Sequence, residues 1–272
     1  MQGCGNDYIY VNLFEEKIED PVNTSIFVSD RHFGIGSDGL ITIGPSDQAD
    51  FCMKMYNADG SESEMCGNGI RCVGKYVYEH HMTDKTSVSI ETGAGIKILT
   101  LFVDKGIVEK VRVDMGKPIL DPEQIPVIAS GERVIDETIR VKDRDFKVTC
   151  VSMGNPHAIV FVENTKEFPI EEYGPYFEKH ERFPRRTNTE FVQIHSASEV
   201  SMRVWERGAC ETWACGTGAC ATAMACILNH KTENQVLVHL RGGDLEIEYD
   251  PETEHIFMTG PAVEVFTGEI SL

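Results

Sequence analysis

The chain has 272 residues, of which 41% are hydrophobic and 25% charged, a composition typical of a globular protein with room for two domains. Its formal net charge of −19 would repel nucleic acids and anionic membranes, so neither is an expected partner. No apolar run reaches transmembrane length, and the first residues do not resemble a signal peptide. Because the nine cysteines follow no disulfide-framework spacing, we expect a cytoplasmic protein with reduced thiols.

Alternation of apolar and polar residues predicts a strand-rich chain with two main helical segments. Helical spacing of apolar residues covers 70–78 and 219–228. A polar, proline-bearing stretch over 117–126 is expected to join two domains. The expected strands, in chain order, cover 8–11, 87–92, 97–103, 108–114, 138–141, 147–151, 158–161, 235–240, 245–249 and 255–259.

A long-period repeat relates the two halves of the chain. The motif Cys-Gly-x-Gly occurs at 66–69 and again at 215–218, an offset of 149 residues. The same offset relates Gly-Asn at 5–6 to Gly-Asn at 154–155, and each pair precedes a strand-like run. It also places Gly39 opposite Asn188, both expected in turn-rich loops. Several features that keep one offset indicate a duplicated module.

Two copies of one module predict an α+β fold with two pseudo-symmetric domains. Each domain is expected to be a curved, mostly antiparallel sheet or barrel wrapped around a central helix. The first module is expected over 1–117 and the second over 118–261. A C-terminal strand over 262–272 is expected to return to the first module.

The two repeated cysteines, Cys66 and Cys215, stand where the helical patterns begin. A cysteine at a helix N-terminus lies at the positive end of the helix dipole, which favours the thiolate. The following glycines, Gly67 and Gly216, allow a ligand to approach the backbone, so that N–H groups can hold a carboxylate.

Two acid–base groups from duplicated modules, facing one carbon from opposite sides, suit stereoinversion. A thiolate would remove the Cα proton on one face while a thiol delivers a proton to the other. No lysine motif indicates pyridoxal phosphate, so we expect no cofactor. The carbanion would then depend on preorganised donors, here the two helix N-termini.

Two other interpretations of Cys66 and Cys215 remain open at this point. They can be buried structural thiols, which is what most free cysteines are. They can also ligate a metal, but the gaps from Cys66 to Cys72 and around Cys215 do not match usual zinc spacing, so we expect no metal.

Seven segments of the chain resemble the diaminopimelate epimerase family. They read GCGND at 3–7, RHFGIGSDG at 31–39, NADGS at 57–61, CGNGIRC at 66–72, GNPH at 154–157, ERG at 206–208 and ETWACGTGAC at 211–220.

The resemblance implies interconversion of LL- and meso-2,6-diaminopimelate, a small-molecule substrate of lysine and cell-wall precursor synthesis. It implies an isomerase with Cys66 and Cys215 as base and acid, without metal or pyridoxal, and suggests a homodimer. The reacting carboxylate would be held by the backbone N–H groups of Gly67, Asn68, Gly216 and Thr217. The amino groups and the distal carboxylate would be held by Asn6, Asn57, Asn155, Asn188, Glu206 and Arg207. The residues that would tune the thiols are His157 and Glu206.

Gly39 departs from the family pattern, since many members have glutamine there, so one substrate contact is expected to be absent or replaced by water. The nearest alternative activity is that of a proline or hydroxyproline racemase. Its cyclic substrate has no distal amino-acid group for Asn188, Glu206 and Arg207 to bind. The alternative from another class is a non-catalytic thiol redox protein.

Overall fold

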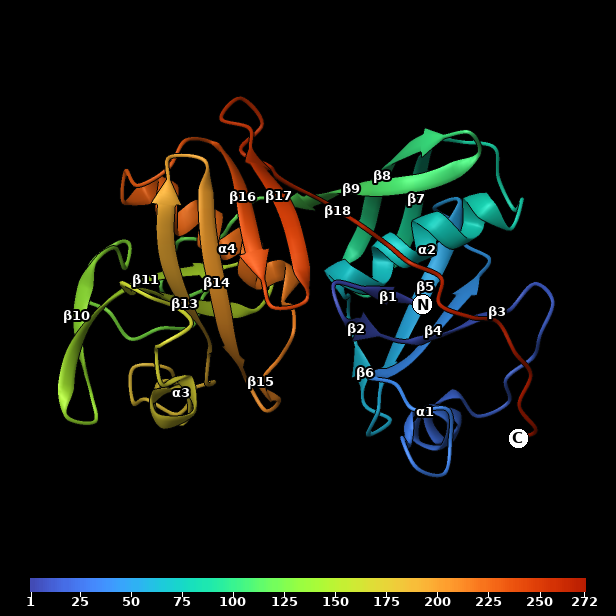
Figure 1. The fold of residues 1–272 in the computed structure, drawn as a ribbon, viewed down its shortest axis with the longest axis horizontal. Coiled ribbons are helices and arrows are strands. Elements are labelled where there is room, and N and C mark those ends of the chain that lie inside the picture. The colour runs from blue at the N-terminus through green and yellow to red at the C-terminus, as the bar shows by residue number, and fades with distance from the viewer. The chain divides into compact units, whose positions relative to one another are not determined.

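The chain folds into two units, each comprising a sheet and a deeply buried helix (Figure 1). In the computed structural model, which describes residues 1–272, the first unit comprises Met1–Asp114 and Thr259–Leu272. The second unit comprises Met115–Met258. The first unit is therefore discontinuous in sequence and includes the last residues of the chain.

The first unit has one extended sheet with the strand order β3-β4-β5-β7-β8-β9. The pairs β3–β4 and β5–β7 are parallel and the remaining pairs are antiparallel. A separate two-stranded hairpin, β1–β2, precedes this sheet. The elements are β1 Gln2–Gly3, β2 Asn6–Asp7, β3 Ile9–Asn12, α1 Pro21–Ser29, β4 Gly39–Gly44, β5 Phe51–Asn57, β6 Glu62–Ser63, α2 Gly67–Glu79, β7 Ser87–Thr92, β8 Gly95–Asp104 and β9 Ile107–Gly116.

The second unit repeats this topology with the strand order β12-β13-β14-β16-β17 and adds the hairpin β10–β11 at its edge. The pairs β12–β13 and β14–β16 are parallel, as are their counterparts in the first unit. The elements are β10 Glu137–Val141, β11 Arg144–Ser152, β12 Pro156–Phe161, α3 Ile170–Glu178, β13 Asn188–Ser196, β14 Glu199–Glu206, β15 Cys210–Glu211, α4 Gly216–Leu228, β16 Gln235–Leu240, β17 Gly243–Tyr249 and β18 Ile256–Gly260.

The helices keep the 149-residue offset along their whole length. Helix α1 begins at residue 21 and α3 at 170, and each has nine residues. Helix α2 begins at residue 67 and α4 at 216, and each has thirteen. Equal offsets, equal lengths and the same mixture of parallel and antiparallel pairs support the duplication inferred from the sequence.

Each main helix is buried against its own sheet. Helix α4 packs against β11, β12, β13, β14, β16 and β17, and its small residues, such as Ala219 and Ala223, let the strands approach closely (Figure 1). The expected architecture, curved and mostly antiparallel sheets around central helices in two related domains, is confirmed.

The expected strands after residue 80 and both main helices are found, most of them slightly longer than expected. Two expectations were wrong. Gly39 and Asn188 do not lie in loops but begin the buried strands β4 and β13. Residues 262–272 belong to the first unit but form no strand, because Pro261 has no N–H to donate and ends the ladder after β18. Val263 and Gln2 form a two-bond bridge, and the Glu264 carboxylate bonds to His80 at 2.8 Å.

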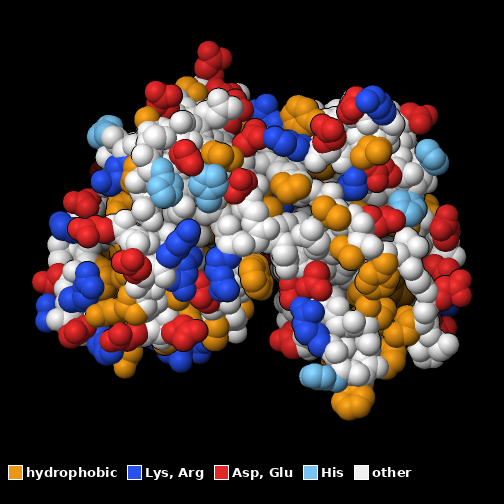
Figure 2. Space-filling model, in the orientation of Figure 1, with side chains coloured by type: hydrophobic (Ala, Val, Ile, Leu, Met, Phe, Trp, Pro, Cys, Tyr) orange, Lys and Arg blue, Asp and Glu red, His pale blue; other side chains and the backbone are white.

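Acidic side chains are spread over the visible face of both units, in keeping with the net charge of −19 (Figure 2). None of the helices combines the length and the hydropathy that crossing a bilayer requires.

A buried arginine ties together three segments of the first unit. Arg71, on α2, is 0% exposed. Its guanidinium donates to the carbonyl oxygens of Gly67 and Pro261 and to Oδ1 of Asn68, at 3.0–3.1 Å. It also contacts Sγ of Cys4, in the β1–β2 turn, at 3.6 Å. The arginine thus fixes the start of α2 against the N-terminal hairpin and the C-terminal segment.

We predict that Arg71→Met destabilises the protein by about 3–5 kcal/mol, because the carbonyl groups that the guanidinium satisfies would remain buried without a donor. Urea denaturation followed by circular dichroism measures this change. Arg140→Met is the matched control, since Arg140 is 63% exposed and should change the stability by less than about 1 kcal/mol. Equal effects of the two substitutions would contradict this role for Arg71.

Candidate active site

Cys66 is the N-cap residue of α2. Its backbone is extended, with φ −127° and ψ 118°, and its sulfur accepts the Gly69 N–H at 3.3 Å. The Cys66 Sγ also lies 3.2 Å from Oδ1 of Asn6, to which the thiol can donate. The sulfur is therefore held between a helix N-terminus and a carboxamide.

Cys215 occupies the same position on α4. Its backbone angles are φ −121° and ψ 108°, and its sulfur accepts the Gly218 N–H at 3.4 Å. Thr217 Oγ1 lies 3.5 Å from the same sulfur. Cys215 is more deeply buried than Cys66, with 7% of its surface exposed. The two helices therefore begin where the sequence predicted, directly after the repeated cysteines.

The last glycine of each Cys-Gly-x-Gly motif is required by close packing on a strand. A Cβ on Gly69 would lie 2.6 Å from Cδ1 of Ile41, on β4. A Cβ on Gly218 would lie 2.6 Å from Oε1 of Glu190, on β13. Ile41 and Glu190 are themselves 149 residues apart, so equivalent positions beneath the two thiols hold an apolar side chain and a carboxylate.

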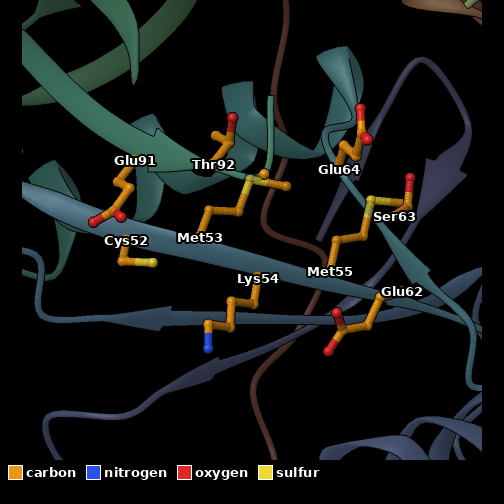
Figure 3. A pocket seen from close by; sticks show the side chains of 10 residues that line it. Cys52, Met53, Lys54, Met55, Glu62, Ser63, Glu64, Glu91 and Thr92 are labelled. Carbon is orange, nitrogen blue, oxygen red and sulfur yellow. The ribbon is translucent and has the colours of Figure 1, made fainter. Parts of the chain in front are cut away.

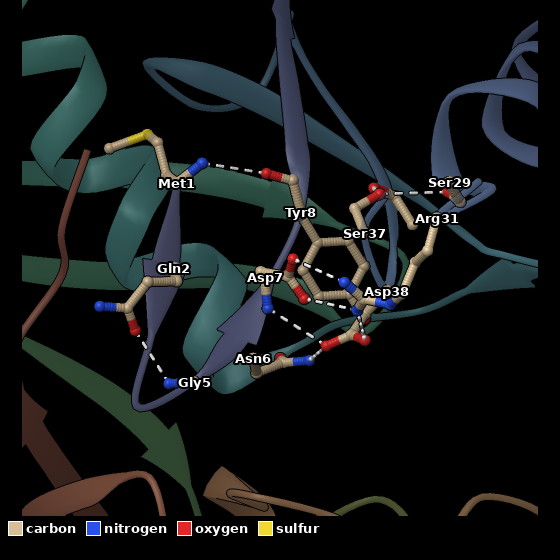
Figure 4. Close-up of polar contacts among 11 residues, drawn as sticks. Met1, Gln2, Gly5, Asn6, Asp7, Tyr8, Ser29, Arg31, Ser37 and Asp38 are labelled. Carbon is tan, nitrogen blue, oxygen red and sulfur yellow. Dashed lines mark hydrogen bonds and ion pairs between the residues drawn. The ribbon is translucent and has the colours of Figure 1, made fainter. Parts of the chain in front are cut away.

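In the first unit, Asp38 holds Asn6 in place (Figure 4). Asp38 Oδ2 accepts the Asn6 side-chain N–H at 2.7 Å and the Asp7 N–H at 3.1 Å. Arg31 bridges Asp38 and Asp7. Burial raises the pKa of Asp38 above its ordinary value, although the bond from Asn6 opposes that effect. This anchoring turns the Asn6 carbonyl towards Cys66.

The structure places Asn57 at the end of β5, where its side chain donates to Ser61 Oγ at 3.0 Å. Asn57 pairs with Gly39 of β4. A Cβ on Gly39 would lie 2.1 Å from the Tyr56 carbonyl oxygen, so no glutamine side chain fits at Gly39 on this backbone. Asn68 is the second residue of α2, and its side chain accepts a hydrogen bond from Arg71.

In the second unit, Asn155 and His157 meet beside β12. His157 is 0% exposed, with Nε2 3.0 Å from Asn155 Oδ1 and Nδ1 2.7 Å from Glu190 Oε1. Glu190 was not among the site residues expected from the sequence. No sequence signal identified it, because its enclosure within the buried run 187–192 is visible only in the folded structure.

Asn188 and Arg207 are joined through the backbone. The Asn188 side chain accepts the Arg207 N–H at 2.9 Å and donates to the Pro156 carbonyl at 2.9 Å. The Arg207 side chain is exposed and donates to the Arg185 carbonyl. Its guanidinium therefore remains open to a ligand anion.

Two carboxylates act on the Cys215 thiol. Burial raises the pKa of Cys215 well above its ordinary value, and the charges of Glu206 and Glu190 raise it further. The Thr217 hydroxyl and the Gly218 N–H oppose these effects. Glu206 is held by a short hydrogen bond from the Thr212 hydroxyl. Burial and the two carboxylates therefore favour the thiol form of Cys215 over the thiolate.

His157, Glu190 and Cys215 are the residues here that could hold a metal ion, since their ligand atoms all lie within 4.8 Å of one another. The spacing of the cysteines in the sequence does not indicate this cluster, because two of its three members are not cysteines. Two of its members, His157 and Glu190, already bond to each other. A metal would have to break that bond and displace the thiol proton of Cys215.

A cavity of about 290 Å³ lies in the first unit, around β5 (Figure 3). Met53 and Met55 point to one side of the strand, while Cys52 and Lys54 point to the other. Burial raises the pKa of Cys52, and Glu91 adds to that effect. The cavity presents no helix N-terminus to its thiol, so it lacks the features that recommend Cys66 and Cys215.

Sequence comparison bears on the same residues. The sequence model of the family described as diaminopimelate epimerase matches residues 1–120 and 149–265, which include both cysteine motifs. The chain belongs to the diaminopimelate epimerase family.

A diaminopimelate epimerase of Agathobacter rectalis is 69% identical to this chain over 279 residues, covering 100% of this chain and 98% of its own. Among solved structures, a PhzF-family phenazine biosynthesis protein of Bacillus anthracis superposes with a TM-score of 0.71 at 18% identity, covering 100% of this chain and 95% of its own. A hydroxyproline epimerase of Agrobacterium vitis has a TM-score of 0.66 at 14% identity, with 96% and 86% covered. The last two similarities establish the fold alone.

We predict that the Cys215 thiol is alkylated by iodoacetamide with a pH midpoint above that of an ordinary cysteine, because the reagent attacks thiolate and the thiol form is favoured here. Glu206→Gln removes one negative charge and should move the midpoint down by about one pH unit, a tenfold rise in thiolate at a given pH. Peptide mass spectrometry measures the modified fraction against pH.

Glu252→Gln serves as the control for this substitution, since Glu252 is exposed, lies in a turn after β17 and should leave the midpoint unchanged. A midpoint that stays in place in Glu206→Gln would show that burial alone governs the Cys215 thiol.

Proposed function

We propose that this protein interconverts LL- and meso-2,6-diaminopimelate without a cofactor, using Cys66 and Cys215 as a proton-accepting and proton-donating pair. The observation that carries the proposal is the duplicated N-cap cysteine. Both sulfurs take the N–H of the third helical residue in nearly the same backbone conformation. The printed name of the 69% identical relative supports the choice of substrate.

The proposed reaction transfers two protons and changes no oxidation state. One cysteine thiolate takes the Cα proton and becomes a thiol, and the Cα–H electron pair remains on the substrate as a carbanion. The other cysteine thiol gives its proton to the opposite face and becomes a thiolate. Positioned acid–base groups of this kind typically accelerate a reaction by about 10²–10⁴-fold.

The carbanion must be stabilised by the protein. The first turns of α2 and α4 carry backbone N–H groups that the helix itself does not use, and they lie at the positive ends of the helix dipoles. We assign the reacting carboxylate to the turns that begin at Gly67 and Gly216. As negative charge develops on that carboxylate, these fixed dipoles bind it more strongly than the ground state.

The remaining polar groups of the substrate fit the remaining polar residues. The exposed Arg207 guanidinium suits the distal carboxylate through two parallel hydrogen bonds. Glu206 and the carboxamides of Asn6, Asn57, Asn155 and Asn188 suit the ammonium groups. A cyclic imino acid has no second carboxylate for Arg207 and no second ammonium group for Glu206, which favours a substrate with a second amino-acid group.

We predict that reduced protein incubated with LL-diaminopimelate in D₂O forms meso product with deuterium at the inverted carbon, because the donating thiol exchanges its proton with solvent. Cys66→Ala and Cys215→Ala should each lower the rate of inversion by at least about 10²-fold. NMR and chiral chromatography measure deuteration and the LL/meso ratio. Cys52→Ala, which changes a thiol in the β5 cavity, should retain full activity.

Inversion at the wild-type rate in Cys66→Ala or in Cys215→Ala would contradict the two-thiol mechanism. Folded, reduced protein without inversion of diaminopimelate would remove the activity itself, and hydroxyproline would then be the next substrate tested.

We further propose a cytoplasmic homodimer that serves lysine and cell-wall precursor synthesis. None of the nine cysteines is in a disulfide, which suits a reducing compartment. The C-terminal segment of the first unit exposes Val265, Phe266 and Leu272 by 61–73%, and such a cluster of apolar side chains suits an interface.

We predict a mass of twice 30.4 kDa by light scattering after size-exclusion chromatography. Phe266→Asp should produce the monomer, because a charge would be buried in the interface. Phe33→Asp is the control, since Phe33 is 85% exposed on the loop after α1 and should not affect the mass. A monomeric wild type would contradict the proposal.

A further inference from the structure

The two halves of the site differ at two equivalent positions. Glu206 of β14 stands 149 residues after Asn57 of β5, and Glu190 of β13 stands 149 residues after Ile41 of β4. In each pair the residue of the first unit is uncharged and the residue of the second unit is a carboxylate. Glu206 was expected to tune a thiol, whereas Glu190 has no role in the proposal above.

Glu190 is a fully buried carboxylate with an incomplete set of partners. It is 0% exposed, and its Oε1 bonds to His157 Nδ1 at 2.7 Å. Its other oxygen, Oε2, is buried without a hydrogen-bond partner. Burying a carboxylate in this way is unfavourable for stability, which indicates that Glu190 has a functional role.

Glu190 lies directly beneath the start of α4. Its Oε1 is so close to Gly218 that a Cβ there would lie 2.6 Å away. A carboxylate oxygen of Glu190, a ring nitrogen of His157 and Sγ of Cys215 all lie within 4.8 Å of one another. A charge at this separation, shielded from solvent, acts strongly on the sulfur.

We propose that Glu190 is a positioning residue that makes the two thiols unequal: it orients His157 beside Cys215 and keeps Cys215 protonated in the resting enzyme, whereas Ile41 places no charge beneath Cys66. This inference rests on the proposed epimerase function for its catalytic meaning. Resting enzyme then holds Cys66 as the proton acceptor and Cys215 as the proton donor.

The groups that face Cys215 come from four elements. They are His157 on β12, Glu190 on β13, Glu206 on β14, and Thr217 with the Gly218 N–H on α4. Burial and the two carboxylates favour the thiol, while the Thr217 hydroxyl and the Gly218 N–H favour the thiolate. After a turnover that leaves Cys215 as thiolate and Cys66 as thiol, Glu190 favours the return of a proton to Cys215.

Two substitutions separate the charge of Glu190 from its hydrogen bond. Glu190→Gln keeps an oxygen that can accept from His157 but removes the charge. Glu190→Ile installs the residue found at the equivalent position and removes both. Glu178→Gln is the control, because Glu178 is also a buried carboxylate of the second unit but bonds to Trp205 and Gly208.

The test measures the pH midpoint of iodoacetamide alkylation at Cys215 and at Cys66 in the full-length protein by peptide mass spectrometry. We expect wild type to be modified first at Cys66. In both Glu190 variants the Cys215 midpoint should fall by about one pH unit, a tenfold gain in thiolate. The Cys66 midpoint should not move, and Glu178→Gln should change neither.

The pH profile of kcat/KM gives the second readout. The alkaline limb, which reports loss of the donor proton, should move to lower pH in both Glu190 variants. Glu190→Ile should also lower kcat further than Glu190→Gln, because His157 loses its anchor. A merely structural role would lower kcat and thermal stability without moving the Cys215 midpoint or the alkaline limb, and that result overturns the proposal.

The alkylation readout needs no substrate, so it distinguishes the two proposals. A shifted Cys215 midpoint in a protein that does not invert diaminopimelate would support the role of Glu190 and reject the function. An unshifted midpoint in an active epimerase would reject the role of Glu190 and leave the function standing.

Discussion

In each unit, a hydrogen bond from a helical N–H to the sulfur of the preceding cysteine organises the surroundings of that cysteine. It places Cys66 and Cys215 at helix N-termini in nearly identical backbone conformations. The N–H belongs to the third helical residue, which lies so close to a strand that only glycine fits at 69 and 218. The residue beneath that glycine, Ile41 or Glu190, can therefore change the protonation of one thiol without affecting the other.

Duplication gives two N-cap cysteines with nearly the same backbone conformation, whereas the proposed inversion needs one thiolate and one thiol. We propose that a few side chains, rather than a change of fold, meet this requirement. Asn57 and Ile41 correspond to Glu206 and Glu190, and burial with two carboxylates raises the pKa of Cys215. At Cys215, burial and the two carboxylates thus oppose the positive end of the α4 dipole, which by itself would favour the thiolate.

Much of this arrangement was accessible from the sequence, because periodicity and the 149-residue offset are local signals. Helix α1 was missed although Asp20-Pro21 is a recognisable cap followed by proline at the first helical position. Helix α3 was missed because Pro175 interrupts its pattern. Glu190 could not be found, since an acidic residue in a strand usually indicates a solvent-facing position, and only tertiary packing shows that it is enclosed.

The bond between Arg71 and the Pro261 carbonyl spans 190 residues of sequence. During synthesis the first unit emerges early, yet its last segment leaves the ribosome only after the entire second unit. The Pro261 carbonyl therefore reaches the buried guanidinium only after the second unit has been synthesised. A nascent chain stopped before residue 259 would carry a start of α2 that is not yet fixed, so the site around Cys66 would be assembled last although its residues are made first.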